Sequence, residues 1–324
     1  MKGRTRLMQA LYFTEFGTSD VLQYGEVPLP QVQANEVLVK NKYIGLNFAD
    51  IYRRRGTYQI EKHYPYIDGY EGAGSIVQVG SAVDPQLLGQ NILYVDVPLA
   101  NAEYVAVPET KVITLPEDIP PKLAATIGLQ GLTADFLAHD LGSDQAPAQV
   151  FITGISGGVG QLLAQILLAD GLQVFGSAST AAKRSVALKM GVQEVFPSRE
   201  FSWLPQQSGK FQTVYDGVGV NLDKSLQLLQ HRGRVVFFGM AGGNPPQIDL
   251  VQMLAESKSI LTGDLWDYLT SFAERKRRSE RLFSYLRQGK IQLTEPKIFA
   301  LSAGKAAHQY LESGKNIGKV LLQP

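Results

Sequence analysis

Short apolar runs recur through the middle of the chain, and stretches long enough for a helix separate them. The runs are rich in Val, Ile and Phe and cover residues 150–153, 173–177, 192–196, 213–216, 234–239 and 259–263. Strands of a parallel sheet are covered on both faces, so they are almost continuously apolar, and each needs a crossover before the next. The pattern predicts an α/β fold with a doubly wound parallel sheet.

The chain before about residue 120 has a different pattern. Its strand-like runs at 37–40, 74–79 and 91–95 alternate with Gly, Pro and Asn, which is typical of a twisted β-rich domain. Helix-like stretches follow residue 263, and a strand-like run at 318–322 ends the chain. We expect this tail to return to the first domain.

These patterns fit a chain of 324 residues, which has room for about two domains. We predict a β-rich catalytic domain made of residues 1–122 and 264–324. Residues 123–263 are predicted to form a dinucleotide-binding domain.

Charge and cysteine content narrow the function. The chain has 31 Lys and Arg against 30 Asp and Glu, which gives no reason to expect a nucleic-acid or membrane partner. It has no cysteine, which excludes disulfides, thiolate zinc sites and a cysteine nucleophile. The N-terminus lacks the apolar core of a signal peptide, and no stretch approaches the roughly 20 apolar residues of a membrane span. We therefore expect a cytoplasmic protein.

Other ionisable residues have plain interpretations. The basic run 275–278 lies in a helix-like stretch, and we interpret it as a solvated helix face, with a phosphate-binding patch as the alternative. The histidines lack metal-ligand spacing and are expected on the surface or in the core. They are His63, His139, His231 and His308.

A glycine-rich turn follows the first apolar run of the predicted sheet and opens an apolar helix. Its spacing is Gly154-x-x-Gly157-x-x-Gly160, a departure from the common G-x-G-x-x-G. Strand, turn and helix stand in the order that places a dinucleotide pyrophosphate on helix N-terminal amides. Tight helix–strand packing is the alternative explanation of the glycines. The cofactor-binding candidates here are Gly154, Ser156, Gly157, Gly158, Val159 and Gly160.

The segment after the second strand indicates which dinucleotide is bound. NAD enzymes usually place an acid there to accept from the ribose hydroxyls. Residues 176–184 contain no acid, but they contain Ser177 and Ser179 and then two cations, which suits a 2′-phosphate and hence NADPH. Lys183 is the candidate phosphate contact, with an ordinary surface position as its alternative. Ser198 or Arg199, after the third strand, is a further candidate.

Several motifs occur in an order that resembles one known superfamily. They are Gly45–Tyr52, Arg55–Tyr58, Gly69–Gly74, Leu129–Ala134, Gly154–Gly160, Asp216–Gly219 and Gly233–Arg234. They resemble the medium-chain dehydrogenase/reductase superfamily, and within it the zinc-free quinone oxidoreductases that include zeta-crystallin. The resemblance covers nearly the whole chain. It implies a Rossmann domain, a GroES-like catalytic domain and Lys183 as a phosphate contact.

Two positions depart from the zinc alcohol dehydrogenases of that superfamily. Those enzymes place a cysteine ligand where this chain has Asn47, and a histidine ligand where it has Tyr70. Zinc prefers Cys and His ligands, so we expect no metal and no Lewis-acid alcohol chemistry. Asp50 and Glu71, although carboxylic, are expected to be structural hydrogen-bond partners.

The resemblance also supplies the catalytic candidates. Asn47 and Tyr52 match positions that line the nicotinamide pocket, and a half-buried core aromatic is an equal alternative for Tyr52. Gln130 could donate to a substrate oxygen. Tyr58 matches the proton donor of related enoyl-thioester reductases. The remaining cofactor-binding candidates are Thr133, for which helix packing is the alternative, Gly239 and Asn316.

The leading hypothesis is an NADPH-dependent quinone reductase that acts on small quinones or similar electrophilic carbonyls. An enoyl-thioester or alkenal reductase with Tyr58 as proton donor is the second hypothesis. A low-turnover NADPH-binding protein, like the lens crystallins, is the third. The sequence does not name the substrate.

An assembly is predicted as well. Runs 234–239 and 259–263 lie near the end of the sheet, and one of them is expected at an edge where a second chain could pair. In quinone reductases of the resembling group, two such sheets meet edge to edge, so we expect a homodimer. A monomer whose edge is shielded by the helix around 272–286 is the alternative.

Overall fold

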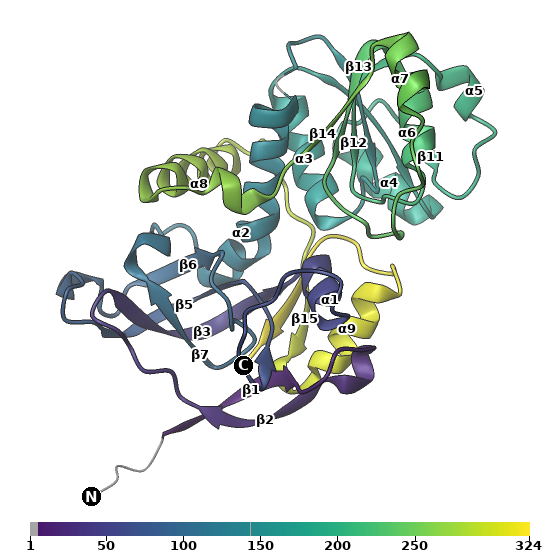
Figure 1. The fold of residues 1–324 in the computed structure, drawn as a ribbon. Coiled ribbons are helices and arrows are strands. Elements are labelled where there is room, and N and C mark those ends of the chain that lie inside the picture. Colours follow the sequence, from purple (N-terminus) through teal and green to yellow (C-terminus); the bar gives the residue numbers. More distant parts are fainter. Residues whose placement is uncertain (1–5, 143) are drawn as a thin grey trace, which may run out of the picture. The chain divides into compact units, whose positions relative to one another are not determined.

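A computed structural model describes residues 6–142 and 144–324 (Figure 1). The chain divides into two compact units. Unit 1 consists of the chain up to Leu129 with Thr270–Ser279 and Thr294–Pro324, and unit 2 consists of Gln130–Leu269 with Glu280–Leu293. The boundaries drawn from the sequence remain a prediction.

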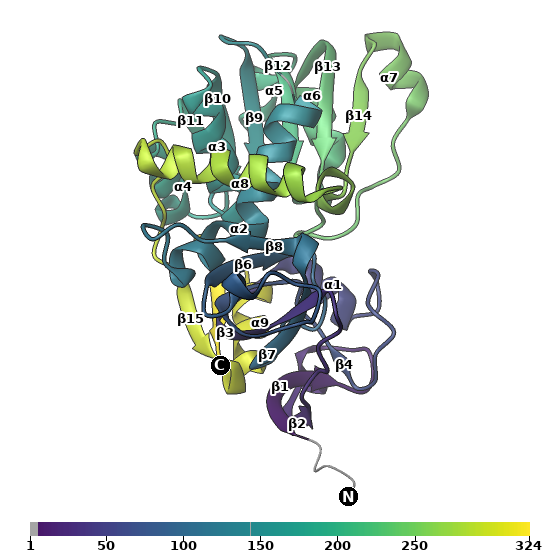
Figure 2. The same ribbon diagram turned by 90° about the vertical axis from the view of Figure 1, so that its left-hand side faces the viewer.

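Unit 2 is built on a six-stranded parallel sheet. In spatial order its strands are β11 (Glu194–Pro197), β10 (Gln173–Ala178), β9 (Gln149–Thr153), β12 (Phe211–Asp216), β13 (Leu229–Phe237) and β14 (Ser259–Thr262). Figure 2 shows them side by side in this order. The predicted doubly wound sheet is confirmed, and β14 is the edge strand next to β13. The strand order reverses between β9 and β12, which is the switch point where such sheets bind ligands.

The helices of unit 2 follow the strands as the sequence pattern indicates. They are α3 (Gly158–Ala169), α4 (Ala181–Lys189), α5 (Leu204–Gln207), α6 (Leu222–Leu228) and α7 (Leu250–Glu256), with a π-helix at Leu137–Gly142 and a 3-10 helix at Leu265–Tyr268. Apolar strand residues are buried beneath them, Val150, Phe151 and Ile152 of β9 almost completely. The ring of Trp203 stacks on Phe196 with centroids 4.4 Å apart, which adds aromatic packing to this core.

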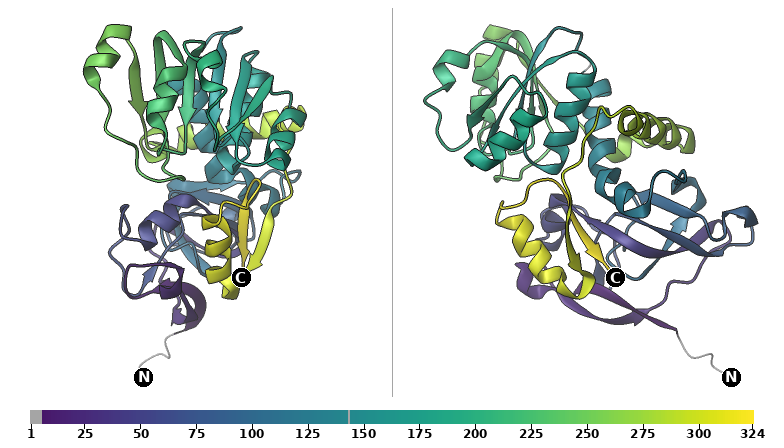
Figure 3. Two further views of the ribbon diagram at one scale, coloured as in Figure 1. Left: turned by 90° about the vertical axis from the view of Figure 1, so that its right-hand side faces the viewer. Right: turned by 180° about the vertical axis from the view of Figure 1, so that it is seen from behind.

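Unit 1 is β-rich. Its larger sheet has the order β15 (Lys297–Ala300), β16 (Val320–Gln323), β3 (Glu36–Leu46), β5 (Glu71–Val79), β6 (Asn91–Val95) and β8 (Val112–Thr114), with β7 (Tyr104–Pro108) also on β3. A smaller sheet has the order β2 (Gln23–Pro28), β1 (Leu7–Phe13) and β4 (Tyr66–Ile67). The terminal strand β16 pairs antiparallel with β3, so the chain end returns to the first domain as predicted (Figure 3).

Unit 1 also contains short helices. They are α1 (Phe48–Arg54) and α9 (Gly304–Glu312), with 3-10 helices at Ser19–Val21, Pro85–Leu87, Glu109–Lys111 and Leu301–Ala303. The boundary between the units passes through α2 (Pro121–Phe136) and α8 (Phe272–Arg287). Within the part of the chain that the structure describes, none of the helices is both long and apolar enough to cross a membrane.

The basic run at the start of α8 differs from its predicted role. Arg275 and Arg278 are only 3% and 2% exposed. Arg275 donates to the carbonyl of Val95 at 2.8 Å and pairs with Asp96 at 3.0 Å, both in unit 1. The interpretation as a solvated helix face is therefore wrong for these two arginines, because one face of the helix is packed and its charges meet polar partners inside the protein.

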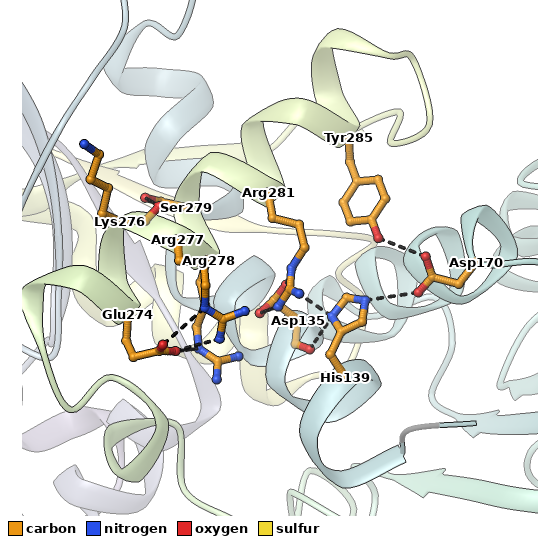
Figure 4. A network of polar contacts seen from close by, with 10 residues as sticks. All are labelled: Asp135, His139, Asp170, Glu274, Lys276, Arg277, Arg278, Ser279, Arg281 and Tyr285. Carbon is orange, nitrogen blue, oxygen red and sulfur yellow. Dashed lines mark hydrogen bonds and ion pairs between the residues drawn. The ribbon is translucent and has the colours of Figure 1, made fainter. Parts of the chain in front are cut away.

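The second half of α8 is tied to its own unit by a polar network (Figure 4). Arg281 makes two hydrogen bonds of 2.6 Å to the carboxylate of Asp135, and the Tyr285 hydroxyl donates to Asp170 at 2.9 Å. His139 lies between these two acids. Its Nε2 is 3.1 Å from the Asp170 carboxylate, and its Nδ1 is 2.9 Å from the backbone carbonyl oxygen of Asp135. Burial alone would lower the pKa of His139, but hydrogen bonds to Asp135 and Asp170 outweigh it and raise the pKa to about 9.

This network predicts a pH-dependent stability. The pKa of His139 is about 9 in the folded protein and 6.5 without these partners, so its stabilising contribution is fully present below pH 6.5 and is lost as pH rises through 9. We expect His139→Ala to lower the free energy of unfolding by about 1–3 kcal/mol at pH 6, and the gap to the unmutated protein to close at alkaline pH. Urea unfolding across this pH range measures both. His231→Ala, at an exposed histidine of the same unit, is the control. An equal gap at pH 6 and pH 10 would contradict the assignment.

Candidate functional site

The glycine turn lies at the switch point of the parallel sheet. Gly154 follows β9 directly and has φ +62°, a left-handed conformation that glycine adopts without strain. Gly157 caps α3, which begins at Gly158. A Cβ at Gly160 would stand 2.6 Å from the carbonyl oxygen of Gly154 and 2.8 Å from the Cα of Ile155. The absence of side chains therefore lets the start of α3 pack directly on the turn, which brings the helix N-terminal amides to the sheet edge.

A buried carboxylate fixes the loop after the neighbouring strand. Asp216 Oδ1 accepts from the backbone N–H groups of Val218 at 2.9 Å and Gly219 at 3.0 Å, and from the Thr153 hydroxyl at 3.1 Å. Its other oxygen accepts from the Ser225 hydroxyl at 2.6 Å. The sequence showed the Asp216–Gly219 motif only as part of the resemblance. Its physical role is to hold the end of β12 against the end of β9.

The ends of β10 and β11 form the third part of this edge. The Ser198 N–H donates to the Ala178 carbonyl at 3.2 Å, which holds the segment after β11 beside the end of β10. Lys183 lies in the first turn of α4, whose N-cap Thr180 accepts from the Lys183 N–H at 3.3 Å. Burial lowers the pKa of Lys183, and the positive charge of Arg199 lowers it further. The charges of Lys183 and Arg199 therefore act on each other although the two residues follow different strands.

The predicted residues of unit 2 thus occupy one edge of its sheet. Ser177, 5% exposed, is the next-to-last residue of β10, and Ser179 follows the strand. Gln130 on α2 lies against the glycine turn, because a Cβ at Gly158 would overlap its side-chain amide. Gly239 packs on the loop after β12, where a Cβ would stand 3.0 Å from the Gly217 carbonyl oxygen. Thr133, half-buried on α2, lies one turn after Gln130.

Unit 1 contains a second cluster, centred on Asn47. Asn47 is the N-cap of α1, and its N–H donates to Asp50 at 2.8 Å. Its side-chain Nδ2 donates to Glu71 at 2.8 Å, and its Oδ1 accepts from the Lys319 ammonium at 3.0 Å. Lys319 also pairs with the Glu71 carboxylate. Asp50 and Glu71 are hydrogen-bond partners as expected, whereas sequence reasoning missed Lys319 because the residue lies far from Asn47 along the chain.

Burial shapes the charge of this cluster. Asp50 is 1% exposed, and burial raises its pKa to about 6, against the opposing charge of Arg53 and the Asn47 N–H. Arg53 pairs with Asp50 at 3.3 Å, and its guanidinium carbon lies 3.6 Å from the ring centroid of Tyr70. The start of α1 is therefore a dense set of paired charges.

The zinc of the alcohol dehydrogenases does not fit the residues of this cluster. Tyr70, which stands in place of a histidine ligand, packs its ring on Arg53 and accepts from the Glu61 N–H at 3.3 Å. An ammonium lies between Asn47 and Glu71, where it would repel a metal ion. Among the residues that the structure describes, no three His, Cys, Asp or Glu side chains form a metal-binding group.

The remaining candidates of unit 1 lie near the same helix or in the C-terminal segment. Tyr52 is half-buried on α1, with its ring centroid 6.3 Å from that of Phe48. Tyr58 is 36% exposed, and its ring centroid is 5.2 Å from the Arg53 guanidinium carbon. Asn316 is 8% exposed and donates to the Gly318 carbonyl at 3.2 Å. Tyr52 and Tyr58 are thus on or beside α1, and the roles of all three stay predictions.

Comparison with known proteins assigns the chain to a family. Residues 33–117 match the alcohol dehydrogenase GroES-like domain and residues 158–272 match the zinc-binding dehydrogenase domain. A probable quinone oxidoreductase of Schizosaccharomyces pombe is 35% identical over 94% of both chains. The chain belongs to the quinone oxidoreductases of the medium-chain dehydrogenase/reductase superfamily. The predicted pairing of a GroES-like domain with a Rossmann domain is confirmed.

Two further relatives of this quinone oxidoreductase show which cofactor and substrates occur among similar proteins. The Escherichia coli quinone oxidoreductase, solved as a complex with NADPH, superposes with a TM-score of 0.92 at 30% identity and covers 98% of this chain and 100% of that one. A 2-haloacrylate reductase of Burkholderia is 28% identical over 98% of this chain and 99% of its own length. The relatives thus include reductases of both quinones and a substituted acrylate.

Proposed function

We propose that this protein is an NADPH-dependent quinone oxidoreductase that reduces small quinones or similar electrophilic carbonyls without a metal. The observation that carries the proposal is the edge of the unit 2 sheet. There, a glycine turn packs against the start of α3 and two cations stand beyond the second and third strands, in a chain whose relatives are quinone oxidoreductases. NADPH, when bound, supplies the hydride.

Each part of the unit 2 edge has a distinct task in this proposal. The amides at the start of α3 bind the pyrophosphate, with Gly157 and Gly160 permitting its close approach. Lys183 and Arg199 bind the 2′-phosphate, and Ser177, Ser179 and Ser198 donate hydroxyl hydrogen bonds to the same end of the cofactor. Positive charge in place of the usual acid is what favours NADPH over NADH.

Unit 1 supplies the remaining groups. A quinone is electron-poor, so hydride transfer to it needs neither a Lewis acid nor a strong proton donor. Asn47 and Tyr52 orient the nicotinamide and the acceptor, and the proton reaches the reduced oxygen from water or from the Tyr52 hydroxyl.

A second function has some support. Tyr58 is partly exposed beside the Arg53 guanidinium, and in this second function it would donate a proton to a carbon atom, as an enoyl or alkenal reductase requires. The 2-haloacrylate reductase among the relatives is consistent with such chemistry.

Substrate comparison separates these functions. We expect the protein to oxidise NADPH with 1,4-benzoquinone much faster than with crotonyl-CoA, and Tyr58→Phe to leave the quinone rate within about twofold, because quinone reduction needs no carbon protonation. NADPH absorbance measures both rates. Faster turnover of crotonyl-CoA, lost in Tyr58→Phe, would establish the enoyl reductase instead. Tight NADPH binding without turnover of any quinone or enone would indicate a binding protein.

Cofactor preference tests the cation pair. We expect Lys183→Ala to weaken NADPH binding by about 1–3 kcal/mol and to leave NADH binding nearly unchanged, because only NADPH carries the 2′-phosphate. Fluorescence titration measures both affinities. Lys189→Ala removes an exposed charge from the same helix and should change neither. Equal affinity of the unmutated protein for the two cofactors would contradict the assignment.

The homodimer is also part of the proposal. β14 forms one edge of the sheet, and α7, which precedes it, exposes Leu250, Val251 and Leu254 at 72%, 74% and 78%. An apolar helix face beside an open strand edge favours pairing with a second copy across a twofold axis. A monomer whose edge is shielded by α8 is the alternative, although the second half of α8 is tied to Asp135 and Asp170 through Arg281 and Tyr285.

Light scattering on a size-exclusion column tests the dimer. At micromolar concentration we expect one species of twice the 35.5 kDa chain mass. Leu254→Glu should shift it to the monomer, because a charge at an apolar interface must be desolvated. Leu188→Glu, at an exposed leucine of α4, should leave the dimer intact. A species of single chain mass in the unmutated protein would rule the dimer out.

A further inference from the structure

Lys319 has no role in the function proposed so far, yet its charge is buried. The side chain is 1% exposed and that of its partner Glu71 is 0% exposed. The ammonium donates to the Glu71 carboxylate and, at 3.0 Å, to the Asn47 Oδ1. Burying a lysine costs free energy that a surface position would avoid, so this placement needs a specific compensation.

The surroundings are built around the Glu71 carboxylate. Its Oε2 accepts from the Leu129 N–H at 2.8 Å. Two glycines make room for it: a Cβ at Gly45 would overlap Oε1, and one at Gly128 would stand 2.8 Å from Oε2. A carboxylate held in this way requires a cation beside it, because an uncompensated buried charge is strongly destabilising.

The register of the sheet places the Lys319 ammonium in this position. β16 runs antiparallel to β3, with Val320 opposite Leu46. The residues one step further, Lys319 and Asn47, therefore face each other at the end of the pairing. By the resemblance described above, Asn47 stands where the zinc alcohol dehydrogenases of the superfamily place a cysteine ligand, and here the Lys319 ammonium contacts both Asn47 and Glu71.

We propose that the Lys319 ammonium is the built-in cation that replaces the metal of the zinc-dependent relatives. It neutralises Glu71, excludes a divalent ion, and fixes the Asn47 carboxamide with Oδ1 toward the ammonium and Nδ2 toward Glu71. Lys319 is thus a positioning residue that acts through Asn47. The ion pair with Glu71 and the exclusion of a metal ion are inferred from the contacts of Lys319 alone. The effect of Lys319 on turnover rests on the proposed quinone reduction.

A mutant cycle tests the proposal. The variants are Lys319→Met, Glu71→Gln, the double variant, Lys319→Arg, and Lys297→Met as the control at an exposed lysine of the adjacent strand. The urea concentration at the midpoint of unfolding, compared between the variants, measures how much the Lys319–Glu71 ion pair stabilises the protein. Steady-state kinetics with 1,4-benzoquinone and NADPH titration report positioning. Elemental analysis after EDTA treatment and then Zn²⁺ addition reports metal exclusion in the unmutated protein.

We expect Lys319→Met to lower the urea midpoint. The double variant should recover most of this loss, because no buried charge is then left unpaired.

In Lys319→Met and in the double variant, kcat should fall roughly tenfold while the affinity for NADPH stays unchanged, since Asn47 is no longer held. Lys319→Arg should retain most of kcat because it keeps the charge. The EDTA-treated protein should retain full activity and bind no stoichiometric zinc.

Three results would overturn the inference. If the losses in urea midpoint of the two single variants add up in the double variant, Lys319 and Glu71 do not stabilise each other as an ion pair. If the double variant keeps the kcat of the unmutated protein, Lys319 does not position Asn47. If the protein binds stoichiometric zinc and loses activity when the zinc is removed, Lys319 does not exclude a metal. An unmutated protein that reduces neither quinones nor enones would instead disprove the proposed function, and the urea and zinc measurements would still judge the Lys319 site.

Discussion

The close contact between α3 and the turn before it is the constraint on which the cofactor-binding edge depends. Gly160 packs on the backbone of Gly154 and Ile155, and any side chain there would push the helix away from β9. The helix N-terminus therefore meets the sheet at its switch point. The ends of β10 and β11 are carried to the same edge by parallel pairing, so residues far apart in sequence meet on the edge where we propose that the cofactor phosphates bind.

Unit 1 follows a different principle, in which buried charges are matched by opposite charges. Glu71 with Lys319 and Asp50 with Arg53 each place a buried acid beside a buried base, and the buried Arg275 pairs with the partly exposed Asp96. Such pairs add little net stability compared with apolar packing, but losing one partner is costly. They also fix geometry, because each charged group accepts only a narrow set of neighbours. This suits a site in which the Asn47 carboxamide must keep one orientation without a metal.

A single helix illustrates how charge and burial can mislead a sequence interpretation. The run 275–278 has the composition of a solvated surface, yet Arg275 reaches the Val95 carbonyl and Asp96 inside unit 1. Further along α8, Arg281 and Tyr285 bind acids of unit 2. Periodicity alone does not distinguish a charged face that meets water from one that meets acids of the protein, because both place charges at the same helical spacing.

Local patterns determined much of this protein. Apolar runs specified the six parallel strands, because buried strands must be apolar over their length, and the glycine spacing specified the turn, because only glycine permits that backbone contact. The ordered motifs specified the family. Tertiary structure decided which strand lies at the sheet edge, that Arg199 stands near Lys183, and that Lys319 faces Asn47 and Glu71. These outcomes depend on pairing between segments distant in the chain, and sequence spacing carries no information about the register in which such segments meet.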